Sequence, residues 1–284
     1  MKILKITGLG IVSICAILAC GRVQQSPEQW NEEVDLGVER AANPDSIKTI
    51  HLFVALCDNK YQGIVPVSQA IGNGQNPHTN LYWGAGYGVR TFFSKSAEWR
   101  LLKRSTIANE EMENAKILET LVFRHKSKPV YLLAHAYNGR HIKEATVDFI
   151  EATSGRFHAE EKLPDGRILQ FGGQSNLSAY IGHNGLMDFK INMLPAGDSS
   201  VTREAIILAC FSKRYFSPYM QQSKASPILW TTHLMAPEAY VIHDALSKWC
   251  LGKSTEEIRT AAASAYAKYQ KCGVNAARRL LVAE

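Results

Sequence analysis

From residue 47 onward, short apolar runs alternate with amphipathic segments, and this alternation constrains the fold more than any other feature of the sequence. The runs are rich in β-branched residues and cover 49–59, 129–139, 177–185, 204–212 and 226–235. Runs of this kind, separated by helix-like segments, predict a mostly parallel sheet flanked by helices. With 284 residues, of which 46% are hydrophobic, the chain can fill one large core. We therefore expect a single α/β domain over residues 47–284.

Four segments are predicted to be helical: 109–125, 141–155, 238–250 and 254–272. Gly155 is a typical helix stop, and Ser254 with Glu257 forms an S-x-x-E capping box. Asp165-Gly166 predicts a small hairpin before the third main strand. The glycine-rich and aromatic stretch 60–93 is long for a loop, so we expect it to be ordered and to line a site or recognise a partner.

The first residues have the layout of an export signal. Lys2 and Lys5 precede an apolar run that is short for a permanent membrane span. The end of this run, Ile17-Leu18-Ala19-Cys20, resembles the lipobox of bacterial lipoproteins, which implies cleavage after residue 19 and a lipid on Cys20. An ordinary cleaved signal without lipid is the alternative. Residues 20–46 are polar and are interpreted as a tether, so we expect an exported bacterial lipoprotein, membrane-anchored on the periplasmic or cell-surface side.

Removal of Cys15 with the signal and use of Cys20 for lipid leave Cys57, Cys210, Cys250 and Cys272 in an oxidising compartment. Four cysteines allow three pairings, and the sequence does not choose among them. A bridge between Cys250 and Cys272 is plausible, and one between Cys57 and Cys210 would remove a candidate nucleophile.

Composition and motifs exclude several other classes of site. The formal charge of +6 comes from 32 basic and 26 acidic residues that are spread along the chain, so no nucleic-acid partner is expected. The spacing of cysteines and histidines suggests no zinc site, no phosphate-binding loop motif occurs, and no cofactor is expected.

His183 and Cys210 follow two successive apolar runs, and both are candidates for one active site. Ligands of open parallel sheets bind beyond the carboxyl ends of the strands, where these two residues are expected to lie. Cys210 would attack as a thiolate, and His183 would act as the base and later as the acid. The backbone amides of Gly185 and Cys210 are candidates for holding the oxyanion. The alternative is a core cysteine and a hydrogen-bonded histidine without chemistry.

The order of these elements, with "AYIGHNG" followed by "IILAC", resembles the caspase, gingipain, legumain and separase group of cysteine peptidases. The resemblance spans residues 47 to 250 as an order of elements but rests on two short motifs. It implies a caspase-like three-layer fold with His183 as the base or acid and Cys210 as the nucleophile. In that group glycine normally follows the histidine directly, whereas here Asn184 intervenes and could orient the imidazole or cap the turn.

A peptide or protein is the expected substrate. In the group named above, the end of the first strand helps to form the pocket for the residue before the cut bond. Asp58 at that place, or Asp188 after His183, would favour Arg or Lys by ion pairing, or would simply stabilise turns. Two other functions stay open: a catalytically silent binding module, and an acyl or peptidyl transferase that uses the same two residues.

Overall fold

The computed structural model describes residues 47–62, 66–108, 111, 114–192, 196–197 and 203–283. The predicted signal, the lipid attachment at Cys20 and the tether lie outside these residues. The strands are β1 (Lys48–Ala55), β2 (Trp99–Thr106), β3 (Ile117–His125), β4 (Val130–Tyr137), β5 (His158–Lys162), β6 (Ile168–Gly172), β7 (Leu177–Gly182), β8 (Glu204–Leu208), β9 (Ser226–Thr231) and β10 (Leu281–Val282). The helices are α1 (Val89–Ser94), α2 (Ile142–Thr153), α3 (Ser212–Ser223), α4 (Ala239–Cys250), α5 (Thr255–Gln270) and α6 (Val274–Leu280), with short 3-10 turns η2 (Gly139–His141) and η3 (Gly185–Met187).

An eight-stranded sheet forms the centre of the domain, in the order β10-β9-β8-β7-β1-β4-β3-β2. β4, β1, β7, β8 and β9 pair in parallel, which confirms the predicted mostly parallel sheet. Numbered along the chain, these five strands run 2-1-3-4-5, an order found in doubly wound sheets. The direction of strand addition reverses at β1 and β7, and such a reversal is where these sheets open a crevice.

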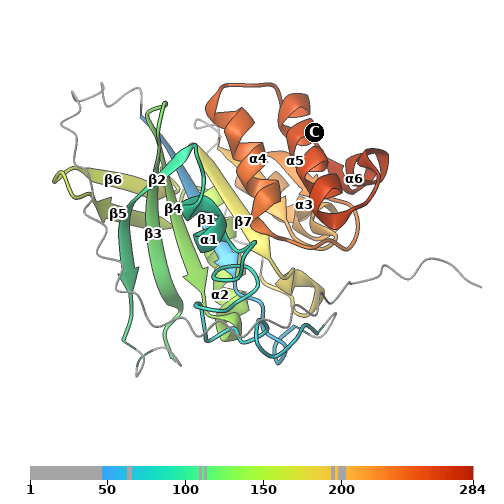
Figure 1. The fold of residues 1–284 in the computed structure, drawn as a ribbon, viewed down its shortest axis with the longest axis horizontal. Coiled ribbons are helices and arrows are strands. Elements are labelled where there is room, and N and C mark those ends of the chain that lie inside the picture. The colour runs from blue at the N-terminus through green and yellow to red at the C-terminus, as the bar shows by residue number, and fades with distance from the viewer. Residues whose placement is uncertain are drawn as a thin grey trace, which may run out of the picture. The chain divides into compact units, whose positions relative to one another are not determined.

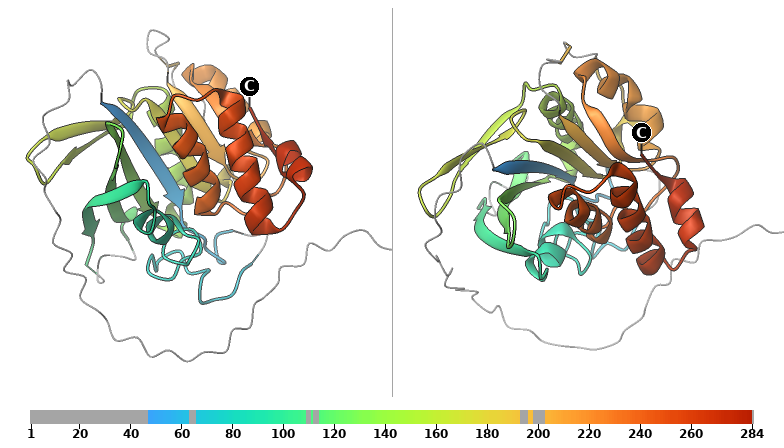
Figure 2. Two further views of the ribbon diagram at one scale, coloured as in Figure 1. Left: turned by 45° about the horizontal axis from the view of Figure 1, so that its top comes forward. Right: turned by 90° about the horizontal axis from the view of Figure 1, so that it is seen from above.

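Helices cover both faces of the sheet, so the domain has three layers (Figures 1 and 2). Side chains of β1 alternate between the faces, as a buried parallel strand requires. Leu52 and Val54 belong to a core that includes α1, α4 and α5 residues, whereas Phe53 and Ala55 join the core formed with α2 and α3. No helix within the described residues is long and apolar enough to span a membrane.

The segment predicted as a helix at 109–125 is instead largely strand β3. It lies between β2 and β4 and pairs antiparallel with both. The local pattern "ILETLVFRH" fits a strand buried on both faces, because Leu118, Leu121 and Phe123 join one core while Val122 joins another. The helix predicted from the apolar spacing across 112–122 was therefore wrong. Pairing with the neighbouring strands β2 and β4 determined the structure of this segment.

Other local predictions are confirmed. β5 and β6 form the hairpin expected around Asp165-Gly166, with Gly166 at a positive φ of 87°. α5 begins with the Ser254 and Glu257 capping box. The helix predicted over 141–155 ends as α2 at Thr153, and Gly155 then adopts a φ of 85°. Each of these signals depends on a few consecutive residues, so the remainder of the fold does not alter them.

Candidate functional site

The carboxyl ends of β1, β7 and β8 meet at one edge of the sheet. β7 pairs with β8 on one side and with β1 on the other, so the residue after β7 lies between the two neighbouring strand ends. The strands that lead to His183 and Cys210 are therefore neighbours. Neighbouring strands are about 5 Å apart, so both candidate residues leave the sheet at the same place.

The backbone before His183 requires glycine. Gly182 ends β7 with a φ of 139°, and a Cβ at this position would lie 2.4 Å from the carbonyl oxygen of Ala55. This close approach turns the chain out of the sheet at His183, whose carbonyl oxygen accepts a 2.7 Å hydrogen bond from the Tyr180 hydroxyl. The result is a histidine that is 6% exposed and held at a defined point of the edge.

Asp188 is the hydrogen-bond partner of the His183 ring. Its Oδ2 contacts Nε2 of His183 across the short turn η3. Within the described residues no hydrogen bond involves Nδ1 of His183. Asp188 was a candidate for substrate recognition, but its contact in the structure is that of a residue that orients an imidazole.

Asn184 connects the His183 loop with the Cys210 loop. Its Nδ2 donates a 2.6 Å hydrogen bond to the carbonyl oxygen of Cys210, and its Oδ1 accepts a 3.1 Å bond from the amide of Leu186. The side chain is fully buried. Both functional groups of this amide are therefore used, and they fix the two candidate loops relative to each other.

Cys210 lies in a tight turn between β8 and α3. The next residue, Phe211, has a left-handed conformation with a φ of 50°, which costs a non-glycine residue about 1–3 kcal/mol. The amide of Met235 donates to Sγ of Cys210 at 3.4 Å. Burial raises the pKa of the Cys210 thiol, and hydrogen bonds with backbone groups of Met235 and of Cys210 itself lower it in part. At neutral pH the free thiol is therefore mostly protonated.

Gly185, the candidate oxyanion donor, is the first residue of η3. Its carbonyl oxygen accepts hydrogen bonds from the amides of Asp188 at 2.9 Å and Phe189 at 3.0 Å. A Cβ at Gly185 would lie 2.5 Å from the ring of Phe189, so the site requires glycine for packing as well.

Asp58 anchors the long loop instead of facing a substrate. It is 3% exposed, and its carboxylate accepts hydrogen bonds from the amides of Lys60, Tyr61 and Gly74 and from the side chain of Gln75. Gln75 also donates to Asn138, at the end of β4. These contacts fold the loop against two strand ends and leave this carboxylate occupied.

No family model, curated protein or solved structure matches this chain. The candidate site is therefore defined by the geometry of the chain itself. Within the described residues, no group of three or more histidine, cysteine or acidic side chains could hold a metal ion.

All four cysteines of the described residues are free thiols. Cys57 and Cys210 follow β1 and β8, and β7 lies between these strands, so the two chain positions are about 10 Å apart. A disulfide needs Cα atoms within about 7 Å. The possible bridge that would have removed the nucleophile is therefore absent.

The bridge between Cys250 and Cys272, one of the pairings that the sequence left open, is not formed, for a related reason. Cys250 ends α4, whereas Cys272 follows the end of α5. The two helices pack side by side as a hairpin (Figure 1), so these positions lie at opposite ends of it. α5 has 16 residues, and its length of about 24 Å separates the two thiols.

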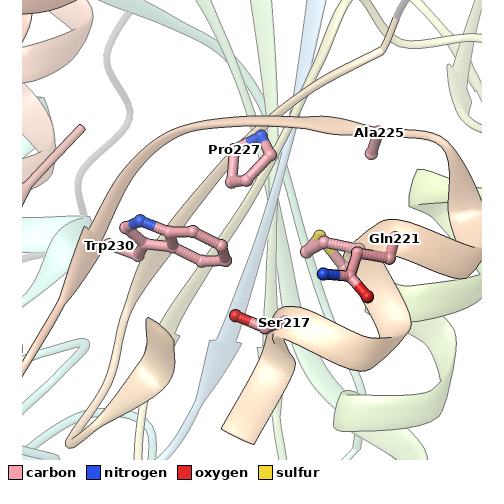
Figure 3. A pocket seen from close by; sticks show the side chains of 6 residues that line it. Ser217, Gln221, Ala225, Pro227 and Trp230 are labelled. Atoms are coloured by element: carbon pink, nitrogen blue, oxygen red, sulfur yellow. The ribbon is translucent and has the colours of Figure 1, made fainter. Parts of the chain in front are cut away.

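A separate small cavity lies between α3 and β9 (Figure 3). It has a volume of about 160 Å³ and is lined by Ser217, Met220, Gln221, Ala225, Pro227 and Trp230. Trp230 lines this cavity, whereas none of the predicted site residues does. The cavity is therefore separate from the edge of the sheet that carries Cys210.

Asn184→Ala is expected to slow any reaction of Cys210 about 10-fold or more, because the Cys210 carbonyl loses its partner and the two loops lose their connection. Asn184→Asp is the matched variant: it keeps the acceptor for Leu186 but removes the donor to Cys210. We expect the rate of thiol alkylation at Cys210 to fall in both variants. An unchanged rate in Asn184→Asp would show that this hydrogen bond does not position the thiol.

Proposed function

We propose that this protein is a cysteine-dependent peptidase with Cys210 as nucleophile, His183 as general base and acid, and Asp188 as the residue that orients the imidazole. The observation that carries the proposal is the hydrogen bond from Asn184 to the Cys210 carbonyl, because it joins the residue directly after His183 to Cys210. The proposal retains the resemblance to the caspase, gingipain, legumain and separase group. It includes export of the protein with lipid on Cys20.

The reaction divides into two acyl transfers. His183 takes the proton of the Cys210 thiol as sulfur bonds to the substrate carbonyl carbon, and the imidazolium then protonates the departing amine as the carbon–nitrogen bond breaks. Water next attacks the thioester while His183 takes its proton. The carbon–sulfur bond then breaks, which releases the acid and restores the thiol. Amides at Gly185 and Cys210 are the proposed donors to the oxyanion.

The raised pKa of Cys210 decides how His183 must act. A thiol with a pKa above its ordinary value is only rarely deprotonated at neutral pH. A stable ion pair between the Cys210 thiolate and a His183 imidazolium is therefore not favoured. His183 is therefore proposed to remove the proton during the attack. The contact of Asp188 with Nε2 supports this role, because it leaves Nδ1 as the ring nitrogen that would take the proton.

A catalytically silent binding module is the second candidate, and the same raised thiol pKa favours it. An unreactive thiol buried at a loop junction needs no base. In this candidate the long loop that Asp58 anchors would recognise a partner. The two candidates differ in whether the reactivity of Cys210 depends on His183.

Iodoacetamide labelling tests the proposal. At pH 7 we expect the alkylation rate of Cys210, followed by peptide mass spectrometry, to fall about 10-fold or more in His183→Ala. As pH rises through the raised pKa of Cys210, the thiol loses its proton without help, so the deficit of the variant should shrink. Damage to the fold would instead change the rate at every pH. Equal rates for the two proteins at pH 7 would favour the binding module.

A further inference from the structure

The loop after β9 contacts the candidate nucleophile and also carries a carboxylate. Met235 in this loop contacts Sγ of Cys210 through its amide at 3.4 Å. Glu238 follows three residues later and directly precedes α4. The sequence predicts no role for Glu238, because no local pattern connects it with Cys210.

The carboxylate of Glu238 has only neutral partners in the described part of the chain. Its Oε2 accepts hydrogen bonds from the Tyr240 hydroxyl at 2.9 Å and from Nε2 of Gln270 at 3.1 Å. No Lys, Arg or His side chain of the described ranges forms an ion pair with it. Burial raises the pKa of Glu238, and the bond from Tyr240 lowers it in part. A cation placed here would find a charge that the protein leaves uncompensated.

The loop between Met235 and Glu238 has a second fixed point. The Tyr266 hydroxyl accepts a 3.2 Å hydrogen bond from the amide of Ala236, which directly follows the residue that contacts Sγ of Cys210. Burial raises the pKa of Tyr82 and of Tyr266, and Cys210 and Glu238 both raise these pKa values further. The loop that contacts the thiol is therefore the loop that carries the carboxylate.

Aromatic rings form a cluster with Tyr240, whose hydroxyl donates to the Glu238 carboxylate. Tyr240 stacks on Tyr269 with ring centroids 4.3 Å apart, and the ring of Tyr87 meets them edge-on at 5.8 Å and 5.1 Å. Tyr87 is 48% exposed. Lys268 already lies over Tyr269, with Nζ 5.2 Å from the ring centroid. Such rings can pack against the aliphatic part of a Lys or Arg side chain and attract its charge.

We infer that Glu238, supported by Tyr240 and Gln270, binds the positively charged side chain of a peptide substrate held at Cys210. The inference rests on the proposed peptidase function and names its substrate class: peptides with Arg or Lys beside the cut bond. It assigns to Glu238 the ion pairing that the sequence suggested for Asp58 or Asp188, whose carboxylates are occupied by the loop and by His183.

Matched peptides test the substrate class. Citrulline has the shape of arginine without its charge, so fluorogenic peptides that differ only in this residue isolate the ion pair. We expect kcat/KM for the arginine peptide to exceed that for the citrulline peptide about 10- to 100-fold. In Glu238→Gln the ratio should approach one. Glu256→Gln, the same change at the far end of α5, should keep the preference. Equal cleavage of both peptides, or a preference retained in Glu238→Gln, would overturn the inference.

A second measurement needs no turnover and separates the two proposals. Methanethiosulfonates carrying an ethylammonium or an ethylsulfonate group react with thiols by the same chemistry. We expect the cationic reagent to modify Cys210 about 10-fold faster than the anionic one, relative to their rates with a free small thiol. The advantage should be lost in Glu238→Gln. If it is present while no peptide is cut, the peptidase proposal fails and the cation site stands. If peptides are cut but neither reagents nor peptides show a charge preference, only the cation site fails.

Discussion

Cys210→Ala is expected to reduce peptide cleavage at least about 10⁴-fold, the largest change in activity that we predict. The substitution removes the sulfur atom that is proposed to form the covalent intermediate and that contacts Met235, whereas the hydrogen bond from Asn184 to the backbone carbonyl of residue 210 can persist. Single-turnover cleavage of a fluorogenic peptide measures the loss. Circular dichroism and thermal unfolding of the same sample verify that the fold is retained.

Cys57→Ala is the matched control for this experiment. Cys57 follows β1, which lies on the other side of β7 from β8, and burial raises the pKa of its thiol to about 11. The side chain is 3% exposed. We expect the variant to keep its activity within a few-fold. If Cys57→Ala loses cleavage while Cys210→Ala retains it, the nucleophile has been assigned to the wrong strand end.

Glu119→Ala is expected to lower the free energy of unfolding by about 3–5 kcal/mol, the largest effect on stability. Glu119 on β3 is 1% exposed, and its carboxylate accepts bonds from Arg104 at 2.7 Å, from Arg90 at 3.2 Å and from the indole of Trp83 at 2.8 Å. It therefore joins β2, α1 and the long loop to the sheet. Its removal leaves the half-buried guanidinium of Arg90 and the buried indole of Trp83 without their carboxylate acceptor. Urea unfolding followed by tryptophan fluorescence measures the change.

A second ion pair of β2, between Lys103 and Glu161 on β5, provides the comparison. Lys103, next to Arg104 on β2, pairs with Glu161 at 2.7 Å, but the lysine side chain is 36% exposed. Glu161→Ala should therefore cost less than about 1 kcal/mol. A loss in Glu119→Ala no larger than that in Glu161→Ala would mean that burial of the Glu119 carboxylate contributes little to holding the loop.

Loss of Glu119 also bears on the candidate site. Trp83 belongs to the same loop as Asn80, whose side chain bonds both backbone groups of Cys57 at the end of β1. The loop is thus fixed at Trp83 by the carboxylate on β3 and at Asn80 by the chain that follows β1, the strand next to β7. The composition of this loop predicts that it is ordered, but the apolar spacing around Glu119 predicts a helix, so its role as the anchor was not predictable from the sequence.

The segment that contains Glu119 illustrates the limit of local patterns. Residues 112–122 have apolar side chains at a spacing compatible with a helix, and the same letters also fit a strand buried on both faces. Hydrogen bonds with β2 and β4 favoured the strand. Pairing partners are distant in the sequence, so no window of eleven residues contains that information.

The alternation of apolar runs by itself determined the parallel sheet and put His183 and Cys210 at strand ends, because a run that fills a buried strand must end where polar and glycine residues begin. Capping boxes and the Asp-Gly turn were equally readable, since their hydrogen bonds join residues a few positions apart. Only the tertiary structure decided the order of the strands. That order set β7 between β1 and β8, kept Cys57 and Cys210 apart, and brought Met235 to the thiol. Contacts between distant segments arise from packing of the whole core, and for that reason Glu238 could not be recognised from the sequence.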